Sequence, residues 1–116
     1  GALLAYVRRG DVSKVHSLRR GAAEAIETVA HGDSRNSKVV GRRIEEIDLP
    51  KGATIGAIVR SHERESGDGK ITREHQVLIA HHDTVIEADD HVIVFVVNKR
   101  MVSKVEKLFQ VAARFF

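Results

Sequence analysis

The segment from residue 39 to residue 60 constrains the fold more than any other part of the chain. Apolar residues recur there at helical spacing, which predicts a short amphipathic helix over Arg42–Ile47. Pro50 disfavours helical geometry at the residue before it, so the helix must stop there. Gly52 then predicts a turn, and the β-branched residues of Thr54–Arg60 predict a strand. The residues at helical spacing are Val40, Ile44 and Ile47.

The rest of the chain predicts further strands and one more helix. Val92–Val97 is continuously apolar, which is typical of a central, buried strand, and Val77–Ala80 predicts a shorter buried strand. Val12–Arg19 alternates only weakly and predicts an edge or linking strand. Asn98 is a good helix cap, and an apolar face predicts a helix over Lys99–Gln110.

The segment Ser61–Gln76 contains a single strongly apolar residue, Ile71. Such a segment buries no core, so we expect a long, mobile loop at a hairpin tip, with Gly67-Asp68-Gly69 as its turn. We also expect that deleting most of this loop leaves the fold intact.

Composition limits the classes of protein to which the chain belongs. Its 116 residues suit one domain, and a 42% apolar share with only 4% aromatic residues predicts an aliphatic core. The absence of cysteine excludes disulfides and thiolate metal sites. The net charge of +3 is spread among both signs, which argues against a nucleic-acid interface. The sequence contains neither a signal peptide nor an apolar run near the ~20 residues of a membrane span.

The sequence contains little that predicts catalysis or metal binding. The histidines lack ligand spacing, and the carboxylates of Glu45-Glu46, Glu87 and Asp89-Asp90 lie at turn or helix-surface positions. Gly67-Asp68-Gly69-Lys70 lacks the alternating carboxylates of a calcium loop, and no nucleophile or phosphate-loop motif occurs. We therefore predict no catalytic residue and no metal site. The histidines are His16, His31, His62, His75, His81, His82 and His91.

The order of several segments resembles the C-terminal domain of regulators of potassium conductance, the RCK-C or TrkA-C family. The residues that carry the resemblance are Ser17–Ile26, then Val-Gly-Arg-Arg-Ile, Ile-Asp-Leu-Pro and Ile-Gly-Ala-Ile with a trailing Arg in 39–60, followed by Val77–His81, Thr84–Glu87, Asp89–Ile93 and Val105–Gln110. The form nearest to it is the last domain of TrkA-type peripheral subunits of bacterial Trk potassium uptake. One departure is the length of Ser61–Gln76, where the family has a short hairpin turn.

The resemblance implies an α+β fold, with a small, mostly antiparallel sheet, a short helix between strands and a C-terminal helix. It implies a strand at Ala23–Ala30, although the composition of that segment favours a helix. It divides the chain into a connection at 1–21 from an upstream nucleotide-binding domain and a regulatory domain at 22–116. NAD is then expected only in that upstream domain, and no cofactor in this chain, whose start at Gly1 suggests a fragment.

The resemblance also implies a function. It predicts a cytoplasmic regulatory domain, peripheral at the inner face of the plasma membrane, that assembles with itself and controls a membrane-embedded potassium transporter subunit. The alternative is a small-ligand sensor domain of another cation transporter or antiporter, which binds a cyclic dinucleotide or nucleotide. The residues that the resemblance assigns to such a ligand are Val40, Gly41, Arg42, Arg43, Ile44, Ile55 and Ile58.

Two sets of apolar residues complete the predictions. The first set should form the core: Ile44, Ile47, Ile58, Ile79, Ile93, Val105 and Leu108. The second set lies near the two ends of the chain and should form the surface of a homodimer, together with the segment Val40–Ile44: Leu3, Leu4, Val7, Phe115 and Phe116. Leu3, Leu4 and Val7 belong to a predicted helix over Ala2–Arg9.

Overall fold

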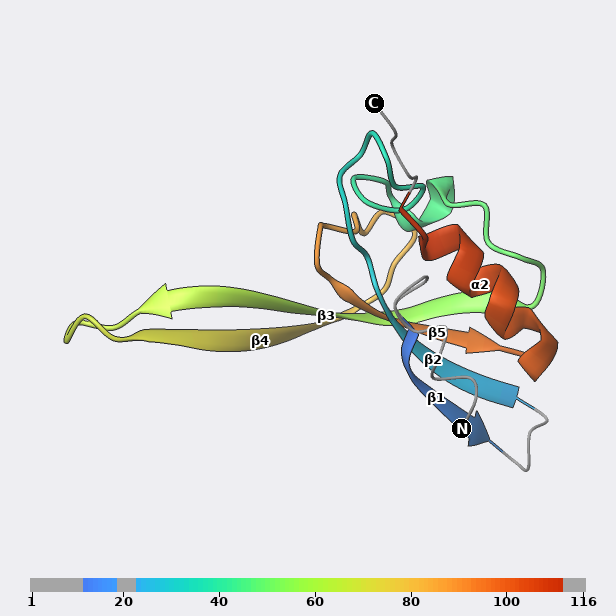
Figure 1. The fold of residues 1–116 in the computed structure, drawn as a ribbon, viewed down its shortest axis with the longest axis horizontal. Helices are drawn as coiled ribbons and strands as arrows, with labels where there is room; N and C mark the ends of the chain where they lie inside the picture. Colours follow the sequence, from blue (N-terminus) through green and yellow to red (C-terminus); the bar gives the residue numbers. More distant parts are fainter. Residues whose placement is uncertain (1–11, 19–22, 112–116) are drawn as a thin grey trace.

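The backbone is organised around a five-stranded antiparallel sheet with the strand order β1-β2-β5-β3-β4 (Figure 1). A computed structural model describes residues 12–18 and 23–111, so the predicted helix at Ala2–Arg9 and the apolar residues near both ends lie outside the described residues. The strands are β1 (Val12–Leu18), β2 (Ala23–Val29), β3 (Ala53–Glu65), β4 (Ile71–Ile79) and β5 (His91–Val96).

One face of this sheet is covered by the C-terminal helix α2 (Val102–Phe109), which follows a single 3-10 turn, η3 (Lys99–Met101) (Figure 1). The side chain of Asn98 caps this region by accepting a hydrogen bond from the Arg100 amide at 2.9 Å, as predicted. Buried residues of α2 pack with those of β2, β3 and β5 in one core that is aliphatic apart from Phe109. The α+β fold class expected from the sequence is confirmed.

Strand β2 confirms the expectation at Ala23–Ala30, where composition alone favours a helix. Its residues alternate between half-buried and buried, with Ile26 and Thr28 fully buried. The strand is bonded on both sides, to β1 and to β5. Pairing and one-sided burial therefore override helix propensity at this position.

The helix predicted over Arg42–Ile47 is wrong in length, because only the 3-10 turn η2 (Ile44–Glu46) forms. Other backbone groups of this segment bond across the structure to the 82–86 segment. Gly41 N–H donates to Ile86 O at 2.7 Å, and Ile44 N–H donates to Thr84 O at 2.9 Å. Ile86 N–H also donates to Arg42 O at 3.0 Å, and this bond occupies the carbonyl that Glu46 N–H would need in an α-helix.

The loop predicted at Ser61–Gln76 is also wrong. Strands β3 and β4 continue outward as a two-stranded arm, paired without interruption from Ala57↔Ile79 to Glu65↔Ile71 (Figure 1). Only the tip at Gly67-Asp68-Gly69 is a turn, as predicted. A strand needs backbone pairing but not a buried side chain, so the lack of apolar residues did not exclude one.

Burial corrects three parts of the predicted core. Ile79, expected inside, is 66% exposed, and its neighbour Val77 is 65% exposed, so Val77–Ala80 is not a buried strand. Ile93 is half-buried on the face of β5 opposite the core, while Val92, Val94 and Val96 are buried. Ile47, Ile58 and Val105 are buried as predicted, and Ile44 and Leu108 pack on the core from its edge.

Within the described residues, no helix has the length and apolar character needed to cross a membrane.

Candidate functional site

The segment assigned to a ligand begins with a turn that places two arginines side by side in the chain. Gly41 adopts φ of 81°, a region that residues with a Cβ rarely enter, so glycine is needed there. The guanidinium of Arg42 donates to Val40 O at 2.8 Å and to Ser34 O at 3.3 Å, and this holds the side chain against the 34–40 loop. Arg42 is therefore fixed in place before any ligand arrives.

Arg43 faces its own short turn. Its guanidinium forms ion pairs with Glu45 at 2.7 Å and with Glu46 at 3.4 Å, and its backbone N–H donates to the Glu46 carboxylate at 2.8 Å. That backbone hydrogen bond, followed by the one from the side chain, lowers the pKa of Glu46. Both arginines are thus close in sequence, but only Arg42 is free of a carboxylate partner among the described contacts.

The remaining residues assigned to the ligand lie in the core or pack against it. Val40, Ile55 and Ile58 belong to the core, with exposures of 6%, 5% and 0%, and Ile44 packs on it. The structure therefore places these residues in the core or packed against it. A ligand at this surface would contact the Gly41–Arg43 turn and not the buried side chains of Val40, Ile55 and Ile58.

A cationic hollow lies beside Arg42. It has a volume of about 570 Å³ and includes Arg35, Lys38 and Lys107 in its lining, with no carboxylate among its lining residues. An adjoining hollow of about 410 Å³ shares Lys38, Arg42 and Lys107 and adds acidic side chains at one side. Such a surface suits a phosphate-bearing anion.

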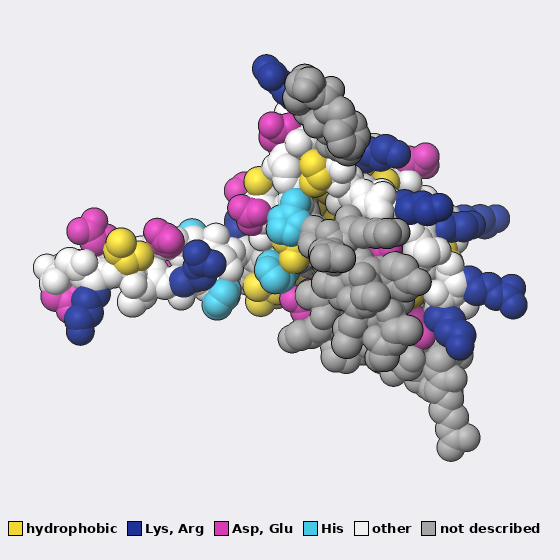
Figure 2. All heavy atoms as spheres, in the orientation of Figure 1, with side chains coloured by type: hydrophobic (Ala, Val, Ile, Leu, Met, Phe, Trp, Pro, Cys, Tyr) yellow, Lys and Arg dark blue, Asp and Glu magenta, His cyan; other side chains and the backbone are white. Residues whose placement is uncertain are grey.

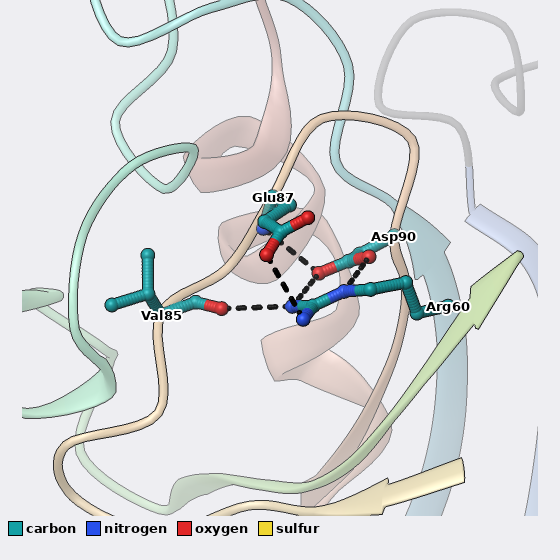
Figure 3. A network of polar contacts seen from close by, with 4 residues as sticks. All are labelled: Arg60, Val85, Glu87 and Asp90. Atoms are coloured by element: carbon teal, nitrogen blue, oxygen red, sulfur yellow. Dashed lines mark hydrogen bonds and ion pairs between the residues drawn. The ribbon is translucent and has the colours of Figure 1, made fainter. Parts of the chain in front are cut away.

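A polar network fixes the root of the arm to the loop before β5 (Figure 3). Asp90 is 1% exposed, and its carboxylate accepts two hydrogen bonds from Arg60, at 2.9 Å each, and one from the Glu87 amide at 2.8 Å. Arg60 also donates to Val85 O at 2.9 Å and pairs with the Glu87 carboxylate at 3.0 Å. Hydrogen bonding to Asp90 raises the pKa of Arg60, so this cation stays charged at any ordinary pH.

Histidines gather near the same root, as the cyan side chains in Figure 2 show. A hollow of about 380 Å³ is lined in part by His31, His62 and His91. His91 contacts Glu27 at 2.8 Å, and His62 lies 3.6 Å from Glu74. Among the residues that the structure describes, no group of His, Asp and Glu is arranged to hold a metal ion.

The arm and the adjoining sheet expose apolar side chains. On β4, Ile71, Val77 and Ile79 are all about two-thirds exposed, at 67%, 65% and 66%. On β5, Phe95 is 45% exposed, and its ring lies over Gly56, where an added Cβ would come within 2.4 Å of the ring. Gly56 occupies the irregularity between Ile55 and Ala57 in the pairing of β3 with β5, so glycine makes room for the ring.

Comparison with known proteins identifies the family. The family model described as the TrkA-C domain matches residues 34–110. The chain belongs to the TrkA-C domain family. This TrkA-C domain is 59% identical, over its full length, to the Trk system potassium uptake protein TrkA of Halomonas elongata, of which it covers 22%. It is 62% identical over 94% of its length to the protein of that name from Vibrio alginolyticus, covering 21%, and 44% identical over 98% to that from Haemophilus influenzae, covering 22%. The TrkA-C domain thus spans about a fifth of the length of these relatives.

Sequence reasoning missed two features of this TrkA-C domain. The partner of Arg60 is Asp90, thirty positions away, and only the pairing of β3 with β5 brings the two together. The exposure of Val77 and Ile79 was missed because a short apolar run was taken as buried. No local signal marked residues 72–76 as a strand, because all five are polar and show no apolar alternation.

Proposed function

We propose that this TrkA-C domain is a regulatory module of a potassium uptake system, and that it acts by self-assembly. The observation that carries the proposal is the exposed apolar surface of β4, where Val77 and Ile79 are each about two-thirds exposed. Soluble domains rarely leave neighbouring large aliphatic side chains open to water without a partner. Relatives that match all or nearly all of the chain are named as Trk system potassium uptake proteins, which supports potassium uptake as the process regulated.

The mechanism we propose is a shift between conformations of an assembly. A homodimer of this domain, as part of a larger ring, would favour one arrangement of a membrane-embedded transporter subunit at the inner face of the plasma membrane. The sensing part, a nucleotide-binding domain that holds NAD, would precede residue 22 in the remaining length of the protein. The Arg60–Asp90 network supports this role, because it fixes the root of the exposed arm to the body of the domain. We propose no catalytic step in this domain.

The test of self-assembly is sedimentation equilibrium of the 116-residue chain over a wide range of concentrations. We expect a dimer that the double substitution Val77→Lys and Ile79→Lys converts to a monomer, with an unchanged far-UV circular dichroism spectrum. The matched control is Val97→Lys, which removes an equally exposed valine, 59% exposed, outside the two strands of the arm. A wild-type chain that stays monomeric at millimolar concentration contradicts the proposal.

The test of regulation uses the full-length protein in cells that depend on it for potassium uptake. Rubidium influx should fall when the protein carries the Val77→Lys and Ile79→Lys pair and stay near wild type with Val97→Lys. Equal influx for all three proteins, at equal expression, would mean that this surface has no part in transport.

A second candidate function is the binding of a nucleotide or cyclic dinucleotide beside Arg42. The cationic hollow of about 570 Å³ and the fixed position of the Arg42 side chain favour it. Calorimetry with cyclic dinucleotides and adenine nucleotides should then show an affinity that Arg42→Gln with Lys38→Gln lowers at least tenfold, whereas Arg64→Gln on the arm leaves it unchanged. Gel filtration separates the two functions, because a dimer that ignores these ligands supports assembly and a ligand-dependent shift supports sensing.

A further inference from the structure

The outer edge of β4 carries unpaired backbone groups. Within the described residues β4 is bonded only to β3, because it is the last strand of the sheet. The phase of this ladder is fixed at both ends, since Ala80 N–H donates to Gly56 O at 3.1 Å and Ser66 N–H donates to Lys70 O at 2.8 Å. Hydrogen-bonded pairs alternate in an antiparallel ladder, so the even-numbered residues of β4 bond to β3. The residues whose N–H and C=O groups point outward are Ile71, Arg73, His75, Val77 and Ile79.

This edge carries two charged residues, Arg73 and Glu74, but lacks the other features by which proteins block edge pairing. It is nine residues long, contains no proline, and pairs with β3 without a bulge. Its outward-bonding residues include Ile71, Val77 and Ile79, all about two-thirds exposed. A long, regular edge with apolar side chains is a template for another strand. The edge is therefore suited to a partner that supplies a strand.

We propose that the partner is a second copy of this chain, and that β4 pairs antiparallel with β4 of that copy about a two-fold axis at His75. The two arms would then lie side by side and join both sheets into one. This proposal rests on the self-assembly proposed above, and it names the surface and the register through which assembly occurs.

The positions of the outward groups select this register. Pairing about His75 places Ile71 opposite Ile79 of the second copy, and Arg73 opposite Val77. Every outward-pointing residue of both strands then has a hydrogen-bonded partner, because the set from residue 71 to residue 79 is symmetric about residue 75. A shift of the axis by one residue leaves one end of that set outside the paired strands.

The charges are compatible with this register and disfavour the two neighbouring registers on its N-terminal side. About His75, Glu74 lies opposite Gln76 and Arg73 lies opposite Val77, so no two like charges are directly opposed. An axis at residue 74 would oppose two glutamates, and an axis at residue 73 would oppose two arginines, both of which are unfavourable. His75 opposes its own copy, and each ring keeps its contact with Ser61 Oγ in its own arm at 2.8 Å. Ile71 gains an apolar partner that its own arm does not supply, since its partner on β3 is Glu65.

Because the chain contains no cysteine, single cysteines report the register directly. A hydrogen-bonded antiparallel pair has Cα atoms ~5.5 Å apart, which lies within the range of a disulfide. His75→Cys should therefore form a disulfide-linked dimer under mild oxidation. The matched control is Thr72→Cys on the same strand, because residue 72 of one copy lies about 20 Å from residue 72 of the other. A mixture of Ile71→Cys and Ile79→Cys chains should link to each other, while each alone should not.

Substitution by proline tests the backbone groups themselves. Val77→Pro removes an N–H that points outward, a position where an edge strand tolerates proline. It should weaken the dimer at least tenfold while leaving the circular dichroism spectrum of the monomer unchanged. Leu78→Pro, which removes an N–H bonded to β3, should instead disturb the fold of the arm.

The outcomes distinguish this proposal from the function on which it rests. A dimer that links through His75→Cys and not through Thr72→Cys supports both. A dimer in which Glu74→Cys or Gln76→Cys links faster, or in which none of these cysteines links, overturns the pairing about His75 and leaves self-assembly standing. A chain that remains a monomer overturns both.

Discussion

Removal of the Arg60 side-chain charge should destabilise the domain more than removal of any charge on the arm. The perturbation is Arg60→Met, which keeps much of the aliphatic length and deletes the guanidinium. It leaves the Asp90 carboxylate, 1% exposed, with only the Glu87 amide as a hydrogen-bond donor among its described partners. The loop carbonyl of Val85 also loses its donor.

The magnitude follows from the burial of the two partners. Breaking a fully buried ion pair by removing one partner costs about 3–5 kcal/mol, because a charge is left buried without compensation. Here Arg60 is 22% exposed and water can replace part of the guanidinium, so we expect a cost of about 2–4 kcal/mol. The matched control is Arg64→Met, since the Arg64–Glu74 pair at 3.2 Å is largely exposed and such pairs contribute about 0–1 kcal/mol.

The assay is urea unfolding followed by far-UV circular dichroism, with each variant at the same low concentration so that association does not contribute. The double variant Arg60→Met with Asp90→Asn should be less destabilised than the sum of the two single changes, because removing both charges leaves neither unpaired. If the free energies of unfolding of Arg60→Met and Arg64→Met differ by less than about 0.5 kcal/mol, the Arg60–Asp90 pair does not stabilise the domain as a buried ion pair.

Three further predictions concern single side chains. Gly56→Ala should destabilise the domain by about 1–2 kcal/mol, because the half-exposed ring of Phe95 can rotate away from the new methyl group, which a backbone atom could not do. The melting temperature measures this loss. Combining Gly56→Ala with Phe95→Leu should recover part of the lost stability. Val94→Ala should lower the free energy of unfolding by about 2–3 kcal/mol and Ile93→Ala by about 1 kcal/mol, since Val94 is fully buried and Ile93 is only half-buried, on the opposite face of β5. A urea melt in which Ile93→Ala is more destabilising than Val94→Ala would contradict this assignment of the two faces. The pKa of Glu46 is lowered below its ordinary value of 4.5, so the ionised carboxylate stabilises the fold above that pH, and this stabilisation is lost as the pH falls through the lower pKa of the folded state. Glu46→Gln should therefore flatten the acid side of the curve of stability against pH. An unchanged acid side would exclude this contribution of Glu46 to stability.

Much of the fold follows from short-range patterns in the chain. The β-branched run of Thr54–Arg60 forms the first part of β3, and the turn at Gly52 has the positive φ of 94° that glycine allows. Asn98 caps the helical segment, as its residue type predicts. Each of these signals depends only on neighbours within a few positions, which is why the sequence is enough to read them.

The candidate site was less predictable, because its geometry depends on distant segments. The amides of the segment around Arg42 bond to the 82–86 segment, so a predicted helix becomes one 3-10 turn. The same folding buries Val40, Ile55 and Ile58 in the core, although they were expected to contact a ligand. No local sequence pattern predicts which backbone groups will form hydrogen bonds with a distant segment.

The sequence by itself determined the secondary structure type of most of the strands and of the C-terminal helix, and it identified the family. The tertiary structure decided which side of each strand is inside. In β5 every residue from Val92 to Val96 is apolar, so both faces of the strand are apolar. The sequence pattern therefore does not show which face is buried. Helix α2 covers one face of the sheet, and that contact makes Val92, Val94 and Val96 the core and leaves Phe95 half-exposed. The exposure of Ile79 on the arm has the same cause, because a side chain is buried only where another layer of the structure packs against it.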